Sequence, residues 1–248
     1  MPSILGIKLS SGNEKSTLEK VKIFLKGERL FYVVTPNPEI ILAALKDEEL
    51  KRILNQADLS LADGFGLKIA GLIKGQKITR ITGADLSLKI LNIAQTENTK
   101  ILIINWIKGL SSALEITTIL KAKYPNLNCL VLDLERKINL DDKEIETINN
   151  FAPKIIFSAL GSPYQEKIIF NNLNSWPSAR FAIGVGGSFD FLTGKAKRAP
   201  KTIRSMGLEW LWRLIQQPQR IKRIYNATIV FPFKVIIATI KGENKNKE

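Results

Sequence analysis

Short β-rich segments alternate with helical patterns between residues 16 and 185, and this alternation constrains the fold more than any other feature of the sequence. The strand candidates are residues 30–35, 101–105, 129–134, 155–160 and 180–185. Helical patterns lie at 85–94, 111–123, 143–150 and 164–173, and Asn37-Pro38-Glu39 marks a further helix start. Strands joined through helices pair in parallel and are covered by those helices. The sequence therefore predicts an α/β fold with a mostly parallel sheet flanked by helices.

The alternation stops near residue 195. Two short helical segments rich in Arg and Trp follow at 207–217 and 218–225, and an apolar stretch follows at 227–240. We therefore predict an α/β core over residues 1–195 and a helical appendage over residues 196–248.

The appendage carries most of the positive charge. Residues 195–248 contain 13 Lys and Arg against three acids, which is +10 of a formal net charge of +14. A concentrated positive segment binds either nucleic-acid phosphates or anionic lipid headgroups, and composition does not decide between them. No run approaches the roughly 20 apolar residues of a spanning helix. The stretch 227–240, which contains Pro232 and Lys234, is either an interfacial helix or a helix docked on the core.

The chain has no histidine and a single cysteine, Cys129, inside an apolar run. This excludes Ser-His-Asp and Cys-His catalysis as well as a disulfide framework. Proton transfer must therefore fall to a carboxylate, Lys or Tyr. The first residues lack the basic and apolar regions of a signal peptide, so we expect a cytoplasmic protein.

Polar residues just after the strand candidates are candidate site residues, because ligands of open α/β sheets bind at the carboxyl ends of the strands. Thr35 and Asn37 follow the first strand, although Asn37 is more simply explained as a helix cap. Asp63 follows a strand-like segment and precedes a Gly-Phe-Gly turn. It is the strongest candidate for a general base, with a helix-capping aspartate as the alternative. Arg80, beside a Gly-containing turn, would clamp a diphosphate or is merely solvated.

Two glycine-bearing turns follow the last two strand candidates. The first contains Gly161 and Gln165, and the second contains Gly186, Gly187 and Asp190. Neither has the spacing of a dinucleotide fingerprint or of a Walker loop. Together they nevertheless favour a cradle for a phosphate or a nucleotide.

Two acidic pairs suggest a metal site at first sight, namely Asp133 with Glu135 and Asp141 with Asp142. Their local patterns are those of a strand end and a helix start. We therefore favour a metal-free site.

Six segments, taken in order, resemble the WecG/TagA/CpsF family of bacterial glycosyltransferases over nearly the whole chain. They are VTPNPE (34–39), ADGFG (62–66), TGADL (82–86), LGSPYQEK (160–167), GVGGSFD (184–190) and GLEWLWRL followed by PQR (207–220). The resemblance implies a Rossmann-like core, a UDP-sugar donor such as UDP-N-acetylmannosamine and an undecaprenyl-diphosphate-linked sugar as acceptor. It also implies inversion at the anomeric carbon without a metal or other cofactor, in the synthesis of a cell-surface polysaccharide or teichoic acid.

The resemblance also implies roles for individual residues. Asp63 would activate the acceptor hydroxyl, while Thr35 and Gln165 would orient the sugar or the acceptor. The nucleotide would be held by Asn37, Arg80, Gly161, Gly186, Gly187 and Asp190. In the appendage, Arg213, Arg220 and Arg223 would close over the site and neutralise the diphosphate leaving group.

Members of this family use the tail at the membrane. The resemblance therefore implies a peripheral protein on the inner face of the cell membrane, held there by its basic C-terminal segment and without a nucleic-acid partner. A homo-oligomer is compatible with this interpretation.

Two segments depart from the family pattern. Residues 104–110 contain one glycine where relatives have a glycine-rich turn, and residues 133–138 replace a His-Gly-Tyr-Phe-like segment. Trp106 would either stack on a base or sugar or fill a pocket that relatives leave open. The main alternative to an active transferase is therefore a paralogue that binds the nucleotide sugar or the lipid diphosphate without turnover.

A nucleic-acid-binding protein is the weakest alternative. It rests only on the charge and the Trp residues of the tail.

Overall fold

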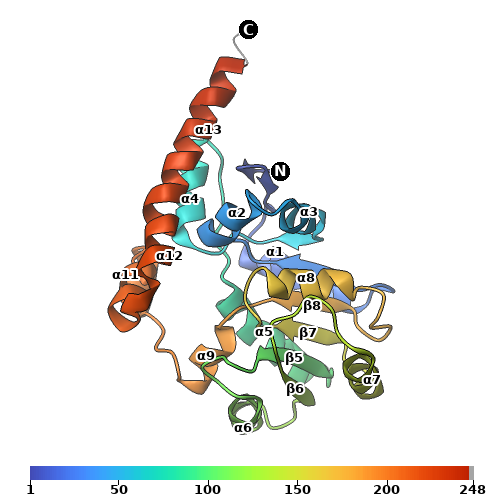
Figure 1. Ribbon diagram of the computed structural model, residues 1–248. Coiled ribbons are helices and arrows are strands. Elements are labelled where there is room, and N and C mark those ends of the chain that lie inside the picture. Colours follow the sequence, from blue (N-terminus) through green and yellow to red (C-terminus); the bar gives the residue numbers. More distant parts are fainter. Residues whose placement is uncertain (246–248) are drawn as a thin grey trace.

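The computed structural model describes residues 1–245. Its centre is a six-stranded sheet in the order β4-β3-β8-β7-β5-β6, with every neighbouring pair parallel (Figure 1). The strands are β3 (Phe31–Val34), β4 (Leu59–Ser60), β5 (Ile101–Trp106), β6 (Cys129–Leu134), β7 (Ile155–Ser158) and β8 (Phe181–Gly184). All five strand candidates are present with ends shifted by at most two residues, so the predicted α/β, Rossmann-like fold class is confirmed.

Helices cover both faces of the sheet. One face carries α1 (Glu14–Leu25), α5 (Gly83–Thr96), α6 (Ala113–Lys123) and α9 (Ser188–Thr193). The other carries α2 (Pro38–Ala44), α3 (Glu48–Gln56), α7 (Asp142–Phe151) and α8 (Tyr164–Asn171). A hydrophobic core lies on each face of the sheet, and alternate residues of a strand contribute to the two cores. In β5, Ile101 and Ile103 pack into the core on the first face, and Leu102 and Ile104 into the core on the second. Burial on both faces explains why the strands are apolar throughout.

Four elements in the first part of the chain were not predicted. Strands β1 (Ser3–Ile4) and β2 (Ile7–Lys8) form an antiparallel hairpin, and α1 and α3 precede β3 and β4. Two-residue strands are too short to show a periodicity. Helix α3 does carry a detectable start signal, because Asp47 accepts a hydrogen bond from the backbone N–H of Leu50 at 2.9 Å.

The appendage is helical, as predicted. It comprises α10 (Lys201–Ser205), α11 (Glu209–Gln216), a 3₁₀ turn η1 (Pro218–Arg220), α12 (Ile221–Tyr225), a π-helical turn η2 (Asn226–Val230) and α13 (Phe231–Lys245). The division of the chain at residue 195 stays a prediction.

The helical run is longer than the sequence indicated. Residues Pro218–Lys241 form the one stretch, within the part of the chain that the structure describes, that is long and apolar enough by length and composition to cross a membrane. The expectation that no such run exists was therefore wrong. It treated residues 218–225 and 227–240 as separate segments, whereas the π-helical turn at Asn226–Val230 joins them into one helical run.

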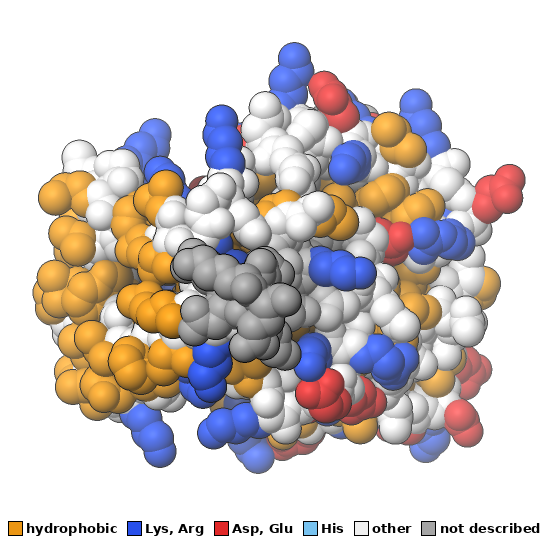
Figure 2. Space-filling model, turned by 90° about the horizontal axis from the view of Figure 1, so that it is seen from above, with side chains coloured by type: hydrophobic (Ala, Val, Ile, Leu, Met, Phe, Trp, Pro, Cys, Tyr) orange, Lys and Arg blue, Asp and Glu red, His pale blue; other side chains and the backbone are white. Residues whose placement is uncertain are grey.

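Helix α13 is docked on the core by one side only. The side chains of Phe231 and Val235 are fully buried in the core beside α2 and α4 (Phe65–Ile73). On the other side Phe233 and Ile240 are more than half exposed, as is Ile229 in the π-helical turn before α13. Hydrophobic side chains gather on this side of the molecule (Figure 2). The docked alternative is thus confirmed, while an interfacial role of the exposed side stays a prediction.

Candidate active site

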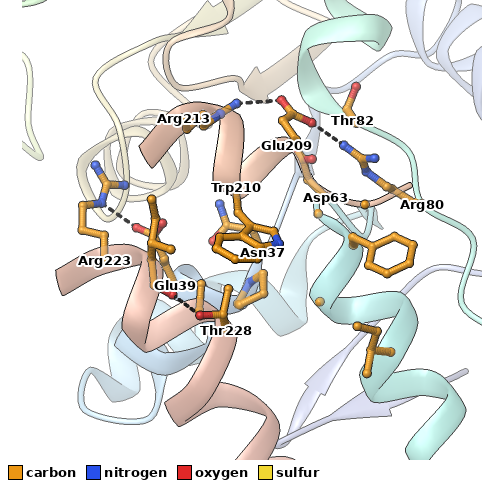
Figure 3. Close-up of a pocket in the computed structure, with 18 of the residues that line it drawn as sticks. Asn37, Glu39, Asp63, Arg80, Thr82, Glu209, Trp210, Arg213, Arg223 and Thr228 are labelled. Carbon is orange, nitrogen blue, oxygen red and sulfur yellow. Dashed lines mark hydrogen bonds and ion pairs between the residues drawn. The ribbon is translucent and has the colours of Figure 1, made fainter. Parts of the chain in front are cut away.

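A pocket of about 380 Å³ lies between the core and the appendage (Figure 3). The core contributes the segments that follow β3 and β4, together with the start of α5. The appendage contributes α11, α12 and the π-helical turn. The polar residues that line the pocket are Asn37, Glu39, Asp63, Arg80, Thr82, Arg198, Glu209, Arg213, Arg220, Arg223 and Thr228. The site therefore lies at carboxyl ends of strands, as predicted, and the appendage forms one of its walls.

Asp63 lies in the loop that joins β4 to α4. The next residue, Gly64, has a φ of +104°, which lets the chain turn sharply there. The Oδ2 of Asp63 accepts a hydrogen bond from the backbone N–H of Gly83, the first residue of α5, at 3.1 Å. Asp63 therefore does not cap its own helix, α4, as the alternative had it; it faces the N-terminus of α5, where a negative charge is stabilised.

Burial raises the pKa of the Asp63 carboxyl. The Gly83 hydrogen bond and the positive charges of Arg80 and Arg213 offset only part of this rise. The carboxyl is consequently a better proton acceptor than an ordinary aspartate once it is ionised.

Arg80 and Arg213 share a carboxylate. The Nη2 of Arg80 lies 2.7 Å from Oε2 of Glu209, and the Nη2 of Arg213 lies 3.1 Å from Oε1 of the same residue. Burial alone would raise the pKa of Glu209, but the two arginines lower it overall, so this glutamate stays charged. The hypothesis that Arg80 is merely solvated is wrong, since only 18% of its side chain is exposed.

Glu209 was not among the predicted site residues. It stands inside the GLEWLWRL segment, but its partner Arg80 is 129 positions away in sequence. No local pattern reveals such a pair.

Arg220 and Arg223 complete the positive side of the pocket. The Nε of Arg223 lies 2.6 Å from Oε2 of Glu39. Arg220 has no carboxylate within 4 Å among residues 1–241, whose side chains the structure describes, and its pKa is lowered by burial and by the charges of Arg223 and Arg213. An unpaired, half-buried guanidinium beside two others favours an anionic ligand. The predicted convergence of Arg213, Arg220 and Arg223 on the pocket is therefore present.

Asn37 has both of its predicted features. Its Oδ1 accepts a hydrogen bond from the backbone N–H of Ile40 at 2.9 Å, which confirms the helix cap, and the residue also lines the pocket. Its role in holding the nucleotide stays a prediction.

Thr35 and Gln165 lie under the turn between β8 and α9. The Oγ1 of Thr35 donates to the carbonyl of Gly184 at 2.9 Å. The Oε1 of Gln165 accepts from the backbone N–H of Gly186 at 2.9 Å, and its Nε2 donates to Glu166 at 2.7 Å. Neither side chain lines the pocket, so contact of either with a sugar stays a prediction.

The glycine-bearing turns contribute no residue to the lining of this pocket. Gly161 has a φ of +78° and packs against the guanidinium of Arg136. Gly187 ends the turn that starts α9, and Asp190 in α9 accepts a hydrogen bond from the hydroxyl of Ser111 at 2.8 Å. Asp190 borders a hollow of about 30 Å³ together with Arg213 and Arg220. The nucleotide-binding role of Gly161, Gly186, Gly187 and Asp190 stays a prediction.

The two segments that depart from the family pattern contact each other. The guanidinium of Arg136 lies 3.6 Å from the centre of the Trp106 ring, and Nδ2 of Asn105 donates to Oδ1 of Asp133 at 2.6 Å. Trp106 is therefore covered by Arg136.

The acidic pairs have the structural roles that their patterns indicated. Asp133 is the penultimate residue of β6 and accepts from the backbone N–H of Ala113, and Asp141 caps α7. Among the side chains that the structure describes, those of residues 1–241, no group of three or more His, Cys, Asp or Glu could hold a metal ion.

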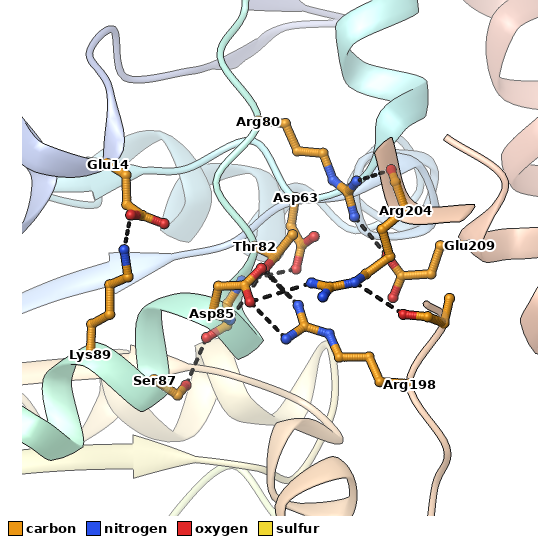
Figure 4. Close-up of polar contacts among 12 residues, drawn as sticks. Glu14, Asp63, Arg80, Thr82, Asp85, Ser87, Lys89, Arg198, Arg204 and Glu209 are labelled. Atoms are coloured by element: carbon orange, nitrogen blue, oxygen red, sulfur yellow. Dashed lines mark hydrogen bonds and ion pairs between the residues drawn. The ribbon is translucent and has the colours of Figure 1, made fainter. Parts of the chain in front are cut away.

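A second polar cluster fastens the appendage to the core (Figure 4). Asp85 in α5 binds both terminal nitrogens of Arg198 at 2.7 Å, and Arg204 lies 3.5 Å from the same carboxylate. The Nη1 of Arg80 donates to the carbonyl of Arg204 at 3.2 Å. Sequence reasoning missed this cluster, although Asp85 belongs to the TGADL segment.

The fold and the pocket together define a Rossmann-like protein whose strand ends open onto one buried carboxylate facing several arginines. This arrangement suits an enzyme that acts on a phosphorylated ligand.

Comparison with known proteins agrees with this class. Residues 2–245 match the glycosyl transferase WecG/TagA/CpsF family. A protein of Bacillus subtilis (strain 168) is 32% identical over 219 residues, which cover 87% of this chain and 81% of the relative. A protein of Staphylococcus aureus (strain MRSA252) is 30% identical over 245 residues, which cover 96% and 93%. Both are named N-acetylglucosaminyldiphosphoundecaprenol N-acetyl-beta-D-mannosaminyltransferase.

The chain belongs to the WecG/TagA/CpsF family and is a glycosyltransferase.

Proposed function

We propose that this glycosyltransferase moves N-acetylmannosamine, or a closely similar sugar, from UDP to a sugar linked to undecaprenyl diphosphate. The names of the relatives support the transferred sugar and the lipid-linked acceptor. The observation that carries the proposal is a buried carboxyl of raised pKa, Asp63, in a pocket walled by arginines. The product would enter the synthesis of a teichoic acid or another cell-surface polysaccharide.

The reaction follows from the two sides of the pocket. The acceptor hydroxyl attacks the anomeric carbon, Asp63 takes the hydroxyl proton, and the bond from that carbon to the UDP oxygen breaks. A single displacement inverts the anomeric centre. Arg213, Arg220 and Arg223 would neutralise the charge that develops on the diphosphate as it leaves. These arginines supply the positive charge that the leaving group needs, so the step requires no metal ion.

The appendage supports an acceptor in the membrane. Its basic residues suit anionic headgroups, and the exposed apolar side of α13 suits the interface between headgroups and acyl chains. We place the protein on the cytoplasmic side, peripheral to the membrane.

Release of UDP, measured with and without a lipid-diphosphate acceptor analogue, tests the proposal. We expect release that depends on the acceptor, and a drop of about 10²–10⁴-fold in Asp63→Asn, the range that general-base catalysis contributes. Asp142→Asn, an exposed aspartate at the start of α7, is the matched control. Equal release by the wild type and Asp63→Asn would refute the role of Asp63. Binding of UDP-sugar without any release would instead identify a non-catalytic paralogue.

A further inference from the structure

A row of three charged side chains joins the core to the appendage beside Asp63 (Figure 3). Arg80 precedes α5 in the core, whereas Glu209 and Arg213 lie one turn apart in α11. The carboxylate of Glu209 lies between the two arginines and contacts each of them through a different oxygen. Only 16% of the Glu209 side chain is exposed, so both ion pairs are largely shielded from water.

The guanidinium of Arg80 is directed at the appendage. Its Nη2 contacts Glu209, and its Nη1 donates to the carbonyl of Arg204 at 3.2 Å (Figure 4). Its Nε is buried without a hydrogen-bond partner in the described part of the chain. Both terminal nitrogens of Arg80 therefore hold groups of the appendage, and one of these groups is the bridging carboxylate.

Arg213 depends on Glu209 for its direction. Glu209 accepts the one side-chain hydrogen bond that Arg213 makes within the residues that the structure describes. The guanidinium carbon of Arg213 also lies 5.3 Å from the centre of the Phe191 ring. The side chain is 42% exposed and lines the pocket. A long side chain with a single polar anchor regains its rotamer freedom when that anchor is removed.

The backbone of α11 has supports of its own. Gly207, just before the helix, packs so closely on Phe65 that a Cβ there would lie 2.5 Å from the ring. The Nε1 of Trp212 donates to the carbonyl of Lys197 at 3.1 Å. Loss of the bridging carboxylate should therefore displace the side chain of Arg213 and leave the helix in place.

We propose that Arg80 and Glu209 are positioning residues: Arg80 fixes Glu209, and Glu209 directs Arg213 at the leaving diphosphate. The inference rests on the proposed function for that diphosphate. Arg80 then serves the reaction through the appendage and does not contact the nucleotide itself. The negative charge of Glu209 also allows two guanidinium groups of like charge to lie close together beside Asp63.

Glutamine substitutions in two backgrounds test this arrangement. In the wild-type background, we expect Arg80→Gln and Glu209→Gln each to lower kcat for acceptor-dependent UDP release about tenfold or more, because a small displacement of a catalytic group costs up to about 10²-fold. The KM for UDP-sugar should change less, since the charge on the diphosphate grows as it leaves. In an Arg213→Gln background, the same two changes should lower kcat less than about twofold, because the side chain that they position is gone.

A purely structural role predicts a different result. If Glu209 held the appendage as a whole, its loss would also displace Arg220 and Arg223, and kcat would fall equally in both backgrounds. Direct contact between Arg80 and the diphosphate would likewise preserve the effect of Arg80→Gln in the Arg213→Gln background. Either persistent loss overturns the inference.

Asp85→Asn is the matched control. It breaks another ion pair between the core and the appendage, that with Arg198, and does not contact Arg213. Its effect on kcat should therefore be the same in both backgrounds. The double variant Arg80→Gln, Glu209→Gln removes both charges of the pair, so it leaves no buried charge unpaired by its partner and should fold. It should lose no more kcat than either single variant, and a loss equal to the product of the two overturns the inference.

Calorimetric binding of UDP gives the same comparison without turnover, because UDP carries the charge that the leaving group acquires. We expect Glu209→Gln to weaken UDP binding in the wild-type background and to leave it unchanged in the Arg213→Gln background. Equal weakening in both backgrounds overturns the inference. Absence of transfer by the wild type overturns the proposed function, and the affinity for UDP then decides the positioning role.

Discussion

Docking of the appendage can be tested with a pair of phenylalanines two residues apart in α13. The side chain of Phe231 is fully buried in the core, whereas Phe233 is 63% exposed. Changing either to alanine removes the same atoms from the same helix. Only the change at Phe231 removes contacts between the appendage and the core.

The expected effects differ by several kcal/mol. Replacing a fully buried phenylalanine with alanine costs about 3–5 kcal/mol, because transfer free energy is lost and a cavity remains. An exposed substitution usually stays within about 0.5 kcal/mol. Since Phe231 joins the appendage to the core, the loss of its contacts first destabilises the docked position of the appendage. A loss of 3 kcal/mol raises the open population more than 100-fold, at 1.4 kcal/mol per factor of ten.

Limited trypsin digestion measures this population. Cleavage after Lys222, which lies inside α12, requires the helix to open, and its rate follows the open fraction when closing is fast. We expect Phe231→Ala to be cleaved at least 100-fold faster than Phe233→Ala, with kcat/KM reduced because Arg213 and Arg220 leave the pocket with the appendage. Equal cleavage rates for the two variants would refute the docking shown by α13.

Three further predictions concern single carboxylates. Because burial raises the pKa of Asp63, kcat/KM should fall with decreasing pH through a pKa above the usual 3.9 of an aspartate. The residual rate of Asp63→Asn should lack this acidic limb of the pH profile. A limb with a pKa at or below about 3.9 would contradict the assignment of Asp63 as the base. Burial also raises the pKa of Glu166, so the folded chain keeps this carboxyl proton at a pH where the unfolded chain has lost it. The free energy of unfolding therefore decreases as the pH rises above about 4.3, the usual pKa of a glutamate. Glu166→Gln should therefore gain unfolding free energy relative to wild type between pH 4 and pH 7, while its carbonyl still accepts from Gln165, and urea titrations at both pH values measure the difference. Asp85→Asn removes the bidentate ion pair with Arg198 and should lower the free energy of unfolding by about 1–3 kcal/mol. An unchanged urea midpoint would show that this cluster does not hold the appendage on the core.

Local pattern was sufficient for much of the fold. The strands are apolar throughout and bounded by turn residues, so their positions follow from hydrophobic runs and helix starts such as Asn37. The place of the site followed from one rule, that ligands bind at strand carboxyl ends, and this rule singled out Asp63. Both inferences use residues that are close together in the chain.

What the sequence could not supply are contacts between distant residues. Nothing near Arg80 shows that it is paired, because Glu209 reaches it only after the appendage folds back over the core. Thr35 and Gln165 stand in the expected segments, yet their polar atoms bind the β8–α9 turn rather than the pocket. Proximity to a strand end gives the neighbourhood of a side chain but not its direction.

The distances in the structure also change the interpretation of the two segments that depart from the family pattern. In the sequence, residues 104–110 and 133–138 are two separate losses near the expected donor site. In the structure, Arg136 stacks on Trp106 at 3.6 Å, and Nζ of Lys108 lies 3.0 Å from the carboxylate of Glu135. Strands β5 and β6 are paired in register up to these residues, so a substitution at the end of one strand changes the surroundings of the residue paired with it on the other strand. A bulky ring introduced alone would leave an unpaired apolar surface, but here each segment supplies the partner of the other. The two departures therefore form one packed cluster, in which neither Trp106 nor Arg136 lines the pocket.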